Sequence, residues 1–323
     1  MRLVMLGTGD FAAPSFASLY GTRHEVLALV TQPERTGRGH HSATVSRMKQ
    51  TALDHGTPVF QPESVNTPES LDELRRYPAD LYIVAAYGQI LSKELLSIPP
   101  RGTVNVHASL LPKYRGAAPI NYAIWKGETE TGVSIIRVLP QLDAGPILGK
   151  VTTPIGPRET AGELEDRLSE LAVPALLQAL KDIEKGCETA IVQEASLVTR
   201  APKMKKTQGA IDWSQAAEQI DRHLRAMQPW PVAYTFVHFA TRAPVRVQIR
   251  QIEPRPEFAS PAGTPPGTVL QATRAGLILK TGSIAVEIPK LQPDGKRELT
   301  AVEFLNGMPV QVGDLWRSAD SQG

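Results

Sequence analysis

The stretch Arg2-Leu-Val-Met-Leu-Gly7-Thr-Gly9-Asp-Phe-Ala12 decides the fold class of this chain. It begins with a nearly unbroken apolar run, which predicts a β-strand buried on both faces. Two glycines follow this run, and residues 11–20 have the apolar spacing of a helix. A strand, a glycine turn and a helix in this order predict the opening unit of an α/β sheet.

The glycine spacing also imitates the dinucleotide fingerprint G-x-G-x-x-A, whose glycines allow a pyrophosphate to approach a helix N-terminus. The second strand, predicted over residues 25–31, carries no acid at its end. Glu34 follows only after Gln32 and Pro33, which is a poor position for a contact with a ribose. A nicotinamide-dependent oxidoreductase therefore stays open as an alternative, which quenching of NADH fluorescence would test.

Strand and helix patterns continue to alternate up to a long helix that opens with the capping box Thr160-Ala-Gly-Glu163. The run over residues 80–87 is the most apolar after the first and predicts a central strand. The alternation predicts an α/β fold, a doubly wound, mostly parallel, Rossmann-like sheet with right-handed crossovers. The other expected elements are helices over 45–55, 68–76 and 119–127, and strands over 58–61, 102–107 and 130–139.

The strand over residues 102–107 delivers polar side chains that a core does not need. Val104 and Val106 share one face of this strand, so Asn105 and His107 share the other. In an open α/β sheet, ligands collect at the carboxyl ends of the strands. Two hydrogen-bonding side chains at such an end predict part of an active site, although an ordinary strand end with a solvated histidine is an alternative.

Asp143 lies on a glycine-proline loop just past another predicted strand. An aspartate in such a place often caps nearby backbone amides, so a local structural role is open. An imidazole, a carboxamide and a carboxylate together suit acyl transfer to an amine without a covalent enzyme intermediate. The amine must lose a proton as it attacks, and the carbonyl oxygen must be stabilised as negative charge develops.

Other chemistries lack their motifs in this sequence. There is no phosphate-binding loop ending in Gly-Lys-Ser/Thr, and Ser109 lacks the G-x-S-x-G context of a serine hydrolase. The pair His40-His41 has no acidic or thiol partner at ligand spacing, so no metal is expected. The single cysteine, Cys187, excludes a disulfide framework and indicates a reducing compartment. With no signal-peptide pattern and no apolar run long enough to span a bilayer, a cytoplasmic location is expected.

The 323 residues predict two domains, and the second differs from the first in pattern and in charge. We expect a first domain over residues 1–188, a linker over 189–206 and a second domain over 207–323. The second domain shows five short strands separated by proline and glycine turns, which favours a small OB-like β-barrel. The net charge of +2 divides into −2 for residues 1–200 and +4 for residues 201–323, which is compatible with a polyanionic partner.

The segments Asn105-Val-His107-Ala-Ser109-Leu-Leu-Pro112 and Leu142-Asp143-Ala-Gly145 together resemble the signature of enzymes that use 10-formyltetrahydrofolate. The resemblance implies that Asn105, His107 and Asp143 are the catalytic trio. It implies that His107 binds or polarises the formyl oxygen and assists proton movement. Asn105 would donate to the developing oxyanion, and Asp143 would orient His107 and relay the amine proton through water. The residues implied to bind the folate are Ser109, Leu110, Leu111, Pro112, Tyr87, Gly88, Ile90 and Leu91.

A second segment indicates which substrate such an enzyme would take. Residues 31–39, with Arg35 and Arg38, resemble the basic loop with which the family members that act on initiator methionyl-tRNA enter its acceptor arm. The resemblance extends in family order over nearly the whole chain and implies a tRNA-contacting second domain and a monomer with no metal and no membrane contact. Lys203, Lys205 and Lys206 would add tRNA contacts. A sugar-amine formyltransferase and a tRNA-binding module without catalysis are the alternatives.

Overall fold

The computed structural model describes residues 1–34, 46–239 and 243–319 of the chain. Its contacts divide the chain into two compact units, which are described separately. The first unit comprises residues 1–120, 130–155 and 163–203, and the second comprises residues 121–129, 156–162 and 204–323.

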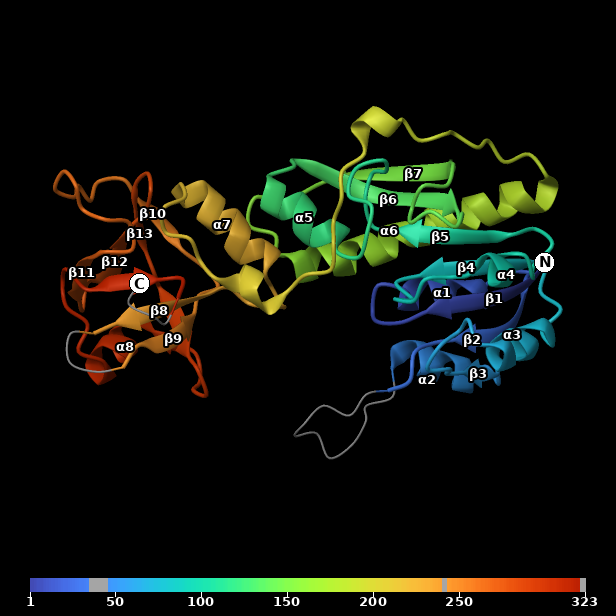
Figure 1. Cartoon of the computed structure of the whole chain (residues 1–323), viewed down its shortest axis with the longest axis horizontal. Helices are drawn as coiled ribbons and strands as arrows, with labels where there is room; N and C mark the ends of the chain where they lie inside the picture. Colours follow the sequence, from blue (N-terminus) through green and yellow to red (C-terminus); the bar gives the residue numbers. More distant parts are fainter. Residues whose placement is uncertain (35–45, 240–242, 320–323) are drawn as a thin grey trace. The chain divides into compact units, whose positions relative to one another are not determined.

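A seven-stranded sheet forms the centre of the first unit, in the order β3-β2-β1-β4-β5-β6-β7. The first five strands of this order run parallel to one another, whereas β6 pairs antiparallel with both β5 and β7 (Figure 1). The prediction of a mostly parallel α/β sheet is therefore confirmed. The strands are β1 (Arg2–Gly7), β2 (Glu25–Val30), β3 (Val59–Phe60), β4 (Leu81–Ala85), β5 (Thr103–His107), β6 (Glu130–Arg137) and β7 (Ile147–Pro154).

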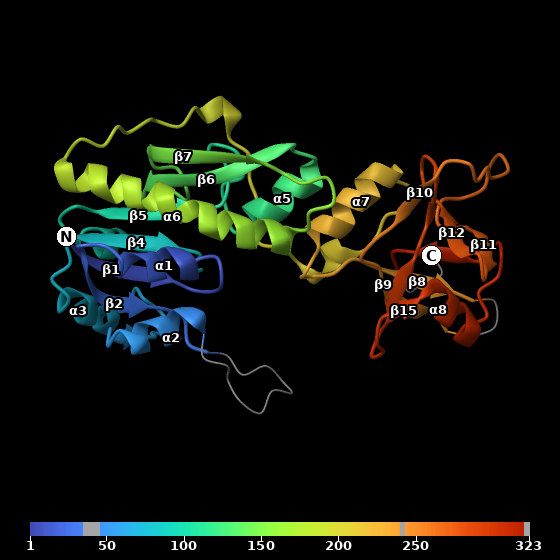
Figure 2. The same cartoon turned by 180° about the vertical axis from the view of Figure 1, so that it is seen from behind.

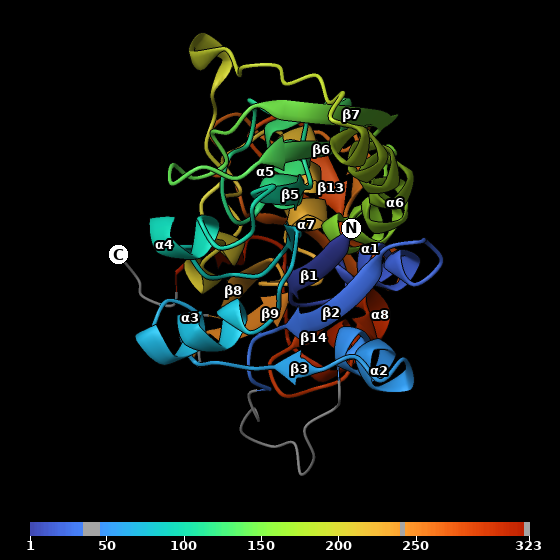
Figure 3. The same ribbon diagram turned by 90° about the vertical axis from the view of Figure 1, so that its right-hand side faces the viewer.

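Helices cover both faces of this sheet. Figures 2 and 3 show α1 and α6 on one face, and Figure 3 shows α3 and α4 on the other. Ser46, Thr67 and Ser92 begin three of the helices, and each side-chain oxygen accepts a hydrogen bond from a first-turn amide, which satisfies a donor that would otherwise lack a partner. The helices of the first unit are α1 (Ala13–Leu19), α2 (Arg47–Asp54), α3 (Pro68–Arg75), α4 (Lys93–Leu96) and α6 (Ala161–Lys185), whereas most of α5 (Pro119–Lys126) belongs to the second unit.

The two most apolar stretches of the sequence lie side by side in the middle of the sheet. Leu3 to Leu6 of β1 are fully buried, and β4 beside them is buried along its whole length. Burying each large apolar side chain of this kind stabilises the fold by about 1.5–3 kcal/mol. The continuous apolar pattern follows from this central position, since helices pack against both faces of these strands.

The second unit is rich in short strands. They form a four-stranded sheet in the order β10-β13-β12-β11 and a five-stranded sheet in the order β15-β14-β9-β8-β16. The unit's helical elements include η2 (Lys206–Gly209), α7 (Ala217–Ala226) and α8 (Ala301–Gly307), whereas η1 (Ala195–Leu197) belongs to the first unit. The strands are β8 (Tyr234–His238), β9 (Val245–Gln248), β10 (Glu253–Arg255), β11 (Val269–Thr273), β12 (Gly276–Lys280), β13 (Ala285–Glu287), β14 (Lys290–Pro293), β15 (Leu299–Thr300) and β16 (Leu315–Arg317).

The five predicted strand positions of this unit are occupied by strands, but the predicted closed barrel is not confirmed. In the part of the chain that the structure describes, the strands form two separate sheets. An isolated bridge between Thr268 and Leu315 connects the neighbourhoods of β11 and β16. Backbone hydrogen bonds from Val269 N to Asp314 O and from Trp316 N to Gly267 O lie beside it. Within the four-stranded sheet, the pairing of β11 with β12 shifts register between Val269 and Gln271, where a bulge leaves one residue unpaired.

None of the helices in the described ranges has both the length and the apolar character that crossing a membrane requires.

Candidate active site

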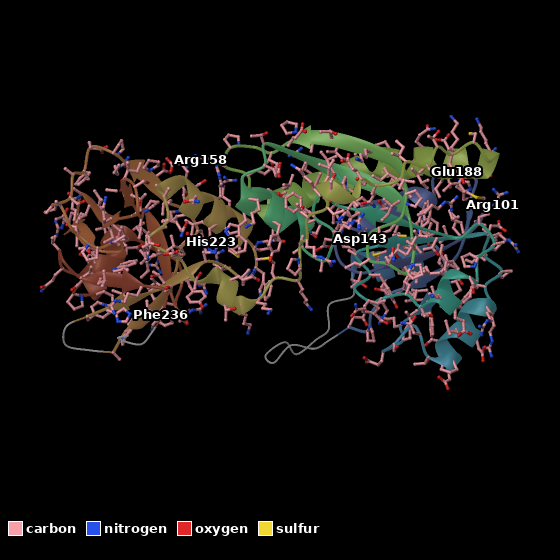
Figure 4. The ribbon with its side chains drawn as sticks, turned by 45° about the horizontal axis from the view of Figure 1, so that its top comes forward. Arg101, Asp143, Arg158, Glu188, His223 and Phe236 are labelled. Atoms are coloured by element: carbon pink, nitrogen blue, oxygen red, sulfur yellow. The ribbon has the colours of Figure 1, made fainter. Side chains whose placement is uncertain are left out.

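Asn105 and His107 project from the same face of β5, at its carboxyl end. Asn105 pairs with Ile136 and His107 with Ser134 of the antiparallel neighbour β6. Asp143 lies on the connection between β6 and β7, which leaves β6 beside the start of β5, where Arg137 pairs with Val104. This connection folds back so that the Asp143 carboxylate reaches Asn105 and His107. In Figure 4 Asp143 lies well away from Arg101 and Glu188, at the opposite end of the sheet. The structure therefore brings all three predicted catalytic residues together.

The contacts among the three side chains run through the carboxylate of Asp143. Asn105 Nδ2 donates to Asp143 Oδ1 at 3.3 Å. Asp143 Oδ2 lies 3.7 Å from His107 Nδ1 and accepts a hydrogen bond from the backbone N–H of Gly116 at 2.9 Å. The side chains of His107 and Asp143 are only 6% and 10% exposed. Water therefore screens an electrostatic interaction between the two side chains less than it would at the protein surface.

The hydrogen bond made by the Nε2 nitrogen of His107 shows which tautomer the imidazole adopts. Nε2 lies 2.9 Å from the carbonyl oxygen of Tyr114, which can only accept a hydrogen bond. Nε2 must therefore carry the hydrogen, and Nδ1, which faces Asp143, is the nitrogen that takes up or releases a proton. This arrangement can hold a proton between His107 and Asp143 at the end of β5.

The main chain around the site adopts left-handed conformations at two residues that are not glycine. Asp143 has φ = 48° and Tyr114 has φ = 62°. Such values are uncommon for residues with a Cβ, and they concentrate at functional sites. The carboxylate of Asp143 accepts from Gly116, which lies 27 positions away in the sequence, so its bond is not the local cap that the sequence left open.

The residues expected to bind the folate differ in exposure. Ser109 and Leu111 are fully buried, and the Ser109 hydroxyl donates to the carbonyl of Lys113 at 2.7 Å. Tyr87 packs in the core of the first unit, and burial raises the pKa of its hydroxyl to about 12. Gly88 and Ile90, by contrast, are exposed, and the remaining members of this set have intermediate or low exposure: Leu110, Leu91 and Pro112. Assignment of the set to the folate stays a prediction.

The residues expected to bind tRNA fall in two places. Arg35 and Arg38, like the pair His40-His41, lie outside the described residues. Lys203, Lys205 and Lys206 are all exposed, so their ammonium groups are free to meet a phosphate. Their assignment to tRNA also stays a prediction.

Glu34, the acid that a dinucleotide site would need for a ribose, already has partners. Its carboxylate is 3.0 Å from the ammonium of Lys49 and accepts from Gln61 Nε2 at 3.3 Å. The hydrogen bond from Lys49 lowers the pKa of Glu34. Since the carboxylate is engaged in these bonds, Glu34 does not favour the nicotinamide alternative.

Sequence reasoning missed Gln193, a residue of the expected linker that bonds to the active-site loops. Its Nε2 donates to the carbonyl oxygens of Asp143 at 2.8 Å and of Gly145 at 2.7 Å. No motif in residues 189–206 marks this glutamine, because its partners lie 48 and 50 positions earlier in the chain. No group of three or more His, Cys, Asp or Glu residues in the described ranges is arranged to hold a metal ion.

Comparison with known proteins identifies the relatives of this chain. The model of the formyl transferase family matches residues 1–180, and the model of the formyl transferase C-terminal domain matches residues 203–309. A methionyl-tRNA formyltransferase of Akkermansia muciniphila is 42% identical over 310 residues, which cover 96% of this chain and 97% of that protein. One of Geobacter sulfurreducens is 40% identical over 322 residues, covering 99% of this chain and 98% of that protein.

Solved structures share the fold at lower identity. A variant of HypX from Aquifex aeolicus superposes with a TM-score of 0.63 at 21% identity, covering 95% of this chain and 47% of that one, so this chain spans about half the length of HypX. The sugar 3N-formyl transferase WlaRD has a TM-score of 0.63 at 16% identity, covering 92% of this chain and 99% of that one. From the family model, which matches more than half of its residues, and from relatives at about 40% identity over nearly its full length, this chain belongs to the formyl transferase family.

Proposed function

We propose that this protein transfers the formyl group of 10-formyltetrahydrofolate to the α-amino group of initiator methionyl-tRNA, giving N-formylmethionyl-tRNA for translation initiation. The observation that carries the chemistry is the convergence of Asn105, His107 and Asp143 at the carboxyl end of β5. The relatives that are 40–42% identical over nearly the whole chain are methionyl-tRNA formyltransferases, which supports this choice of substrate.

In this reaction the amine nitrogen attacks the formyl carbon and the bond from that carbon to the donor nitrogen breaks. Asn105 uses one N–H of its carboxamide on Asp143, so its other N–H is available for the oxygen on which negative charge develops. The proton lost by the amine passes to the carboxylate of Asp143 or to His107 Nδ1. The same pair then returns a proton to the folate nitrogen that leaves. No covalent enzyme intermediate is needed.

The folate and the tRNA would meet different parts of the chain. We infer that the pterin-bearing donor lies against residues 109–112, of which Leu110 and Pro112 are partly exposed. The exposed Gly88 and Ile90 would also contact it. Arg35, Arg38 and the three lysines at 203, 205 and 206 would contact tRNA phosphates. The excess of +4 over residues 201–323 supports this assignment, since phosphate contacts dominate nucleic-acid affinity.

We further infer that residues 1–188 form the catalytic domain, residues 189–206 the linker and residues 207–323 an OB-like tRNA-binding domain. The match of two separate family models, to residues 1–180 and 203–309, supports this division. The bridge between Thr268 and Leu315 supports an OB-like arrangement, because it is where a barrel would close across β11 and β16.

One assay tests the proposal. The purified protein is given 10-formyltetrahydrofolate together with initiator methionyl-tRNA, elongator methionyl-tRNA or a nucleotide-linked amino sugar. We expect rapid formylation of the initiator tRNA and little of the other two acceptors. Formylation of the sugar alone would make the protein a sugar-amine formyltransferase, and tRNA binding without any transfer would make it a binding module.

A further inference from the structure

The segment of residues 191–201, here called the strap, lies along the loops that carry the active-site residues. Its backbone bridges Ile147 at Ile191 and Arg115 at Arg200. Two hydrogen bonds fix the second contact: Arg115 N donates to Thr199 O at 2.9 Å, and Ala201 N donates to Arg115 O at 2.8 Å. All of these residues belong to the first unit. The strap is therefore a regular part of the structure around the site rather than a loose connection.

Gln193 uses its whole side-chain amide within this contact. Its Nε2 donates to Asp143 O at 2.8 Å and to Gly145 O at 2.7 Å, which engages both of its hydrogens. Its Oε1 accepts from Arg115 Nε at 3.0 Å and from Arg115 Nη2 at 2.7 Å. The residue is only 9% exposed, so each of these bonds is costly to leave unmade.

These four bonds connect the two loops that determine where the carboxylate of Asp143 lies. Asp143 and Gly145 belong to the β6–β7 connection, which carries the carboxylate. Arg115 is next to Gly116, whose N–H donates to Asp143 Oδ2 at 2.9 Å. Gln193 thus holds the loop that bears the carboxylate against the loop that donates to it. Gln193 also bonds to the carbonyl oxygen of Asp143, a residue whose backbone has a left-handed φ of 48°.

Thr199 makes the matching contact for His107. Its Oγ1 accepts from Tyr114 N at 2.8 Å. The backbone of Tyr114 has a left-handed φ of 62°, and its carbonyl oxygen accepts a hydrogen bond from His107 Nε2 at 2.9 Å. One side chain of the strap therefore sets the position of Asp143, and another sets the position of the residue that orients His107.

We propose that Gln193 is a positioning residue for formyl transfer and that Thr199 acts with it, so that the strap holds His107 and Asp143 in their reactive arrangement. The inference rests on the formyl transfer proposed above. Neither residue needs to touch a substrate in this role. Replacing them should lower the rate of the chemical step and leave substrate binding nearly unchanged, because misplacing a catalytic group by about 1 Å can cost about 100-fold in rate.

Gln193→Glu is the most informative variant, because it keeps an acceptor for Arg115 and removes both donors to the carbonyls. We expect kcat to fall about 10- to 100-fold with KM for either substrate within about threefold of the original protein. Thr199→Val, which removes the acceptor for Tyr114 N, should lower kcat in the same way but less. Gln178→Glu is the matched control, since Gln178 is an exposed glutamine of α6 bonded to Asp182.

Hydrogen exchange gives a readout that does not depend on activity. Amides of residues 141–145 should exchange faster in Gln193→Glu than in the unsubstituted protein or in Gln178→Glu, because the loop is then held by two fewer bonds from the strap. Folding is checked by thermal unfolding, and if Gln193→Glu does not fold, Thr199→Val decides the question.

The inference is overturned if the folded variants keep kcat within about twofold of the unsubstituted protein, or if only KM for tRNA changes. An unsubstituted protein that transfers no formyl group would overturn the proposed function instead. The two failures are therefore distinct.

Discussion

Asp143 is the residue on which the other groups of the site converge. Asn105, His107 and Gly116 all lie within 3.7 Å of its two carboxylate oxygens. A carboxylate that accepts two hydrogen bonds and lies beside an imidazole is held in one orientation. Its role in proton movement can therefore be separated from its role in packing by changing its charge alone.

Asp143→Asn keeps the shape of the side chain and removes its charge and most of its basicity. We expect kcat for formyl transfer to fall about 10²–10⁴-fold, the usual contribution of a general acid–base group. His107→Ala should lower it by a similar factor. Rates under single-turnover conditions measure the effect, with Asp182→Asn, at a position of α6 bonded to Gln178, as control. Rates within a few-fold of the original for both variants would show that the pair does not move the proton.

Glu253 gives a prediction for pH dependence in the second unit. Two hydrogen bonds from Arg158, each 2.8 Å long, together with one from Gln251, hold the pKa of Glu253 at about 2. Because the folded pKa is below the unfolded value of about 4.3, the pair stabilises the fold above about pH 5 and this effect disappears as the pH falls toward 2. The Arg158 side chain is 66% exposed, so solvent screening keeps the contribution small.

Glu253→Gln should therefore lower the free energy of unfolding by no more than about 1 kcal/mol at pH 7 and by progressively less between pH 5 and pH 3. Urea unfolding at several pH values measures the difference from the unsubstituted protein. Glu257→Gln, at an exposed position nearby, serves as control. A difference that grows as the pH falls would contradict the assigned sign.

At the scale of elements, the β6–β7 connection brings Asp143 back to the end of β5. It can do so only because the chain turns closely against the end of β6. A Cβ on Gly145 would lie 1.7 Å from the carbonyl oxygen of Arg137, the last residue of β6. The glycine is required by this close backbone approach, since any side chain would displace the loop.

Gly145→Ala should therefore lower both stability, by about 1–3 kcal/mol, and kcat, since the loop that carries Asp143 must move. Gly149→Ala in β7 is the control, because a Cβ there would meet no atom within 4 Å. Thermal unfolding and formyl transfer are measured on both variants. Unchanged kcat in a folded Gly145→Ala protein would show that the site tolerates a shift of this connection.

At the scale of the whole molecule, charge is distributed unevenly along the chain. Residues 1–200 carry −2 and residues 201–323 carry +4. The exposed lysines at 203, 205 and 206 lie where the acidic part of the sequence gives way to the basic part. A nucleic acid that binds through exposed lysines does so with an affinity that falls as the salt concentration rises.

Lys205→Gln combined with Lys206→Gln should raise KM for initiator tRNA and leave kcat nearly unchanged. The slope of log affinity against log salt should become shallower by about one for each phosphate that the protein no longer neutralises. Binding and transfer at several salt concentrations measure the slope. Lys181→Gln combined with Lys185→Gln removes the same charge from exposed positions of α6. An equal effect in both pairs would mean that only net charge matters.

The sequence alone predicted β1 to β6 of the first sheet because local periodicity records burial. The apolar runs of β1 and β4 predicted central strands, and both lie in the middle of the sheet. The second unit was harder, since strands of two to five residues carry little pattern. The sequence predicted the positions of only some of these strands. Which strands pair, and in which register, depends on turns and bulges such as the register shift between β11 and β12.

What the sequence by itself determined about this protein is the α/β order of its first sheet, the common face of Asn105 and His107, and a set of groups suited to acyl transfer. The period of two along a strand is enough to fix that common face. Only the tertiary structure decided that Asp143 reaches them, that Gly116 and Gln193 hold it, and which residues near the site stay exposed. These contacts join residues 27 to 50 positions apart, and the spacing of neighbours along the chain carries no information about them.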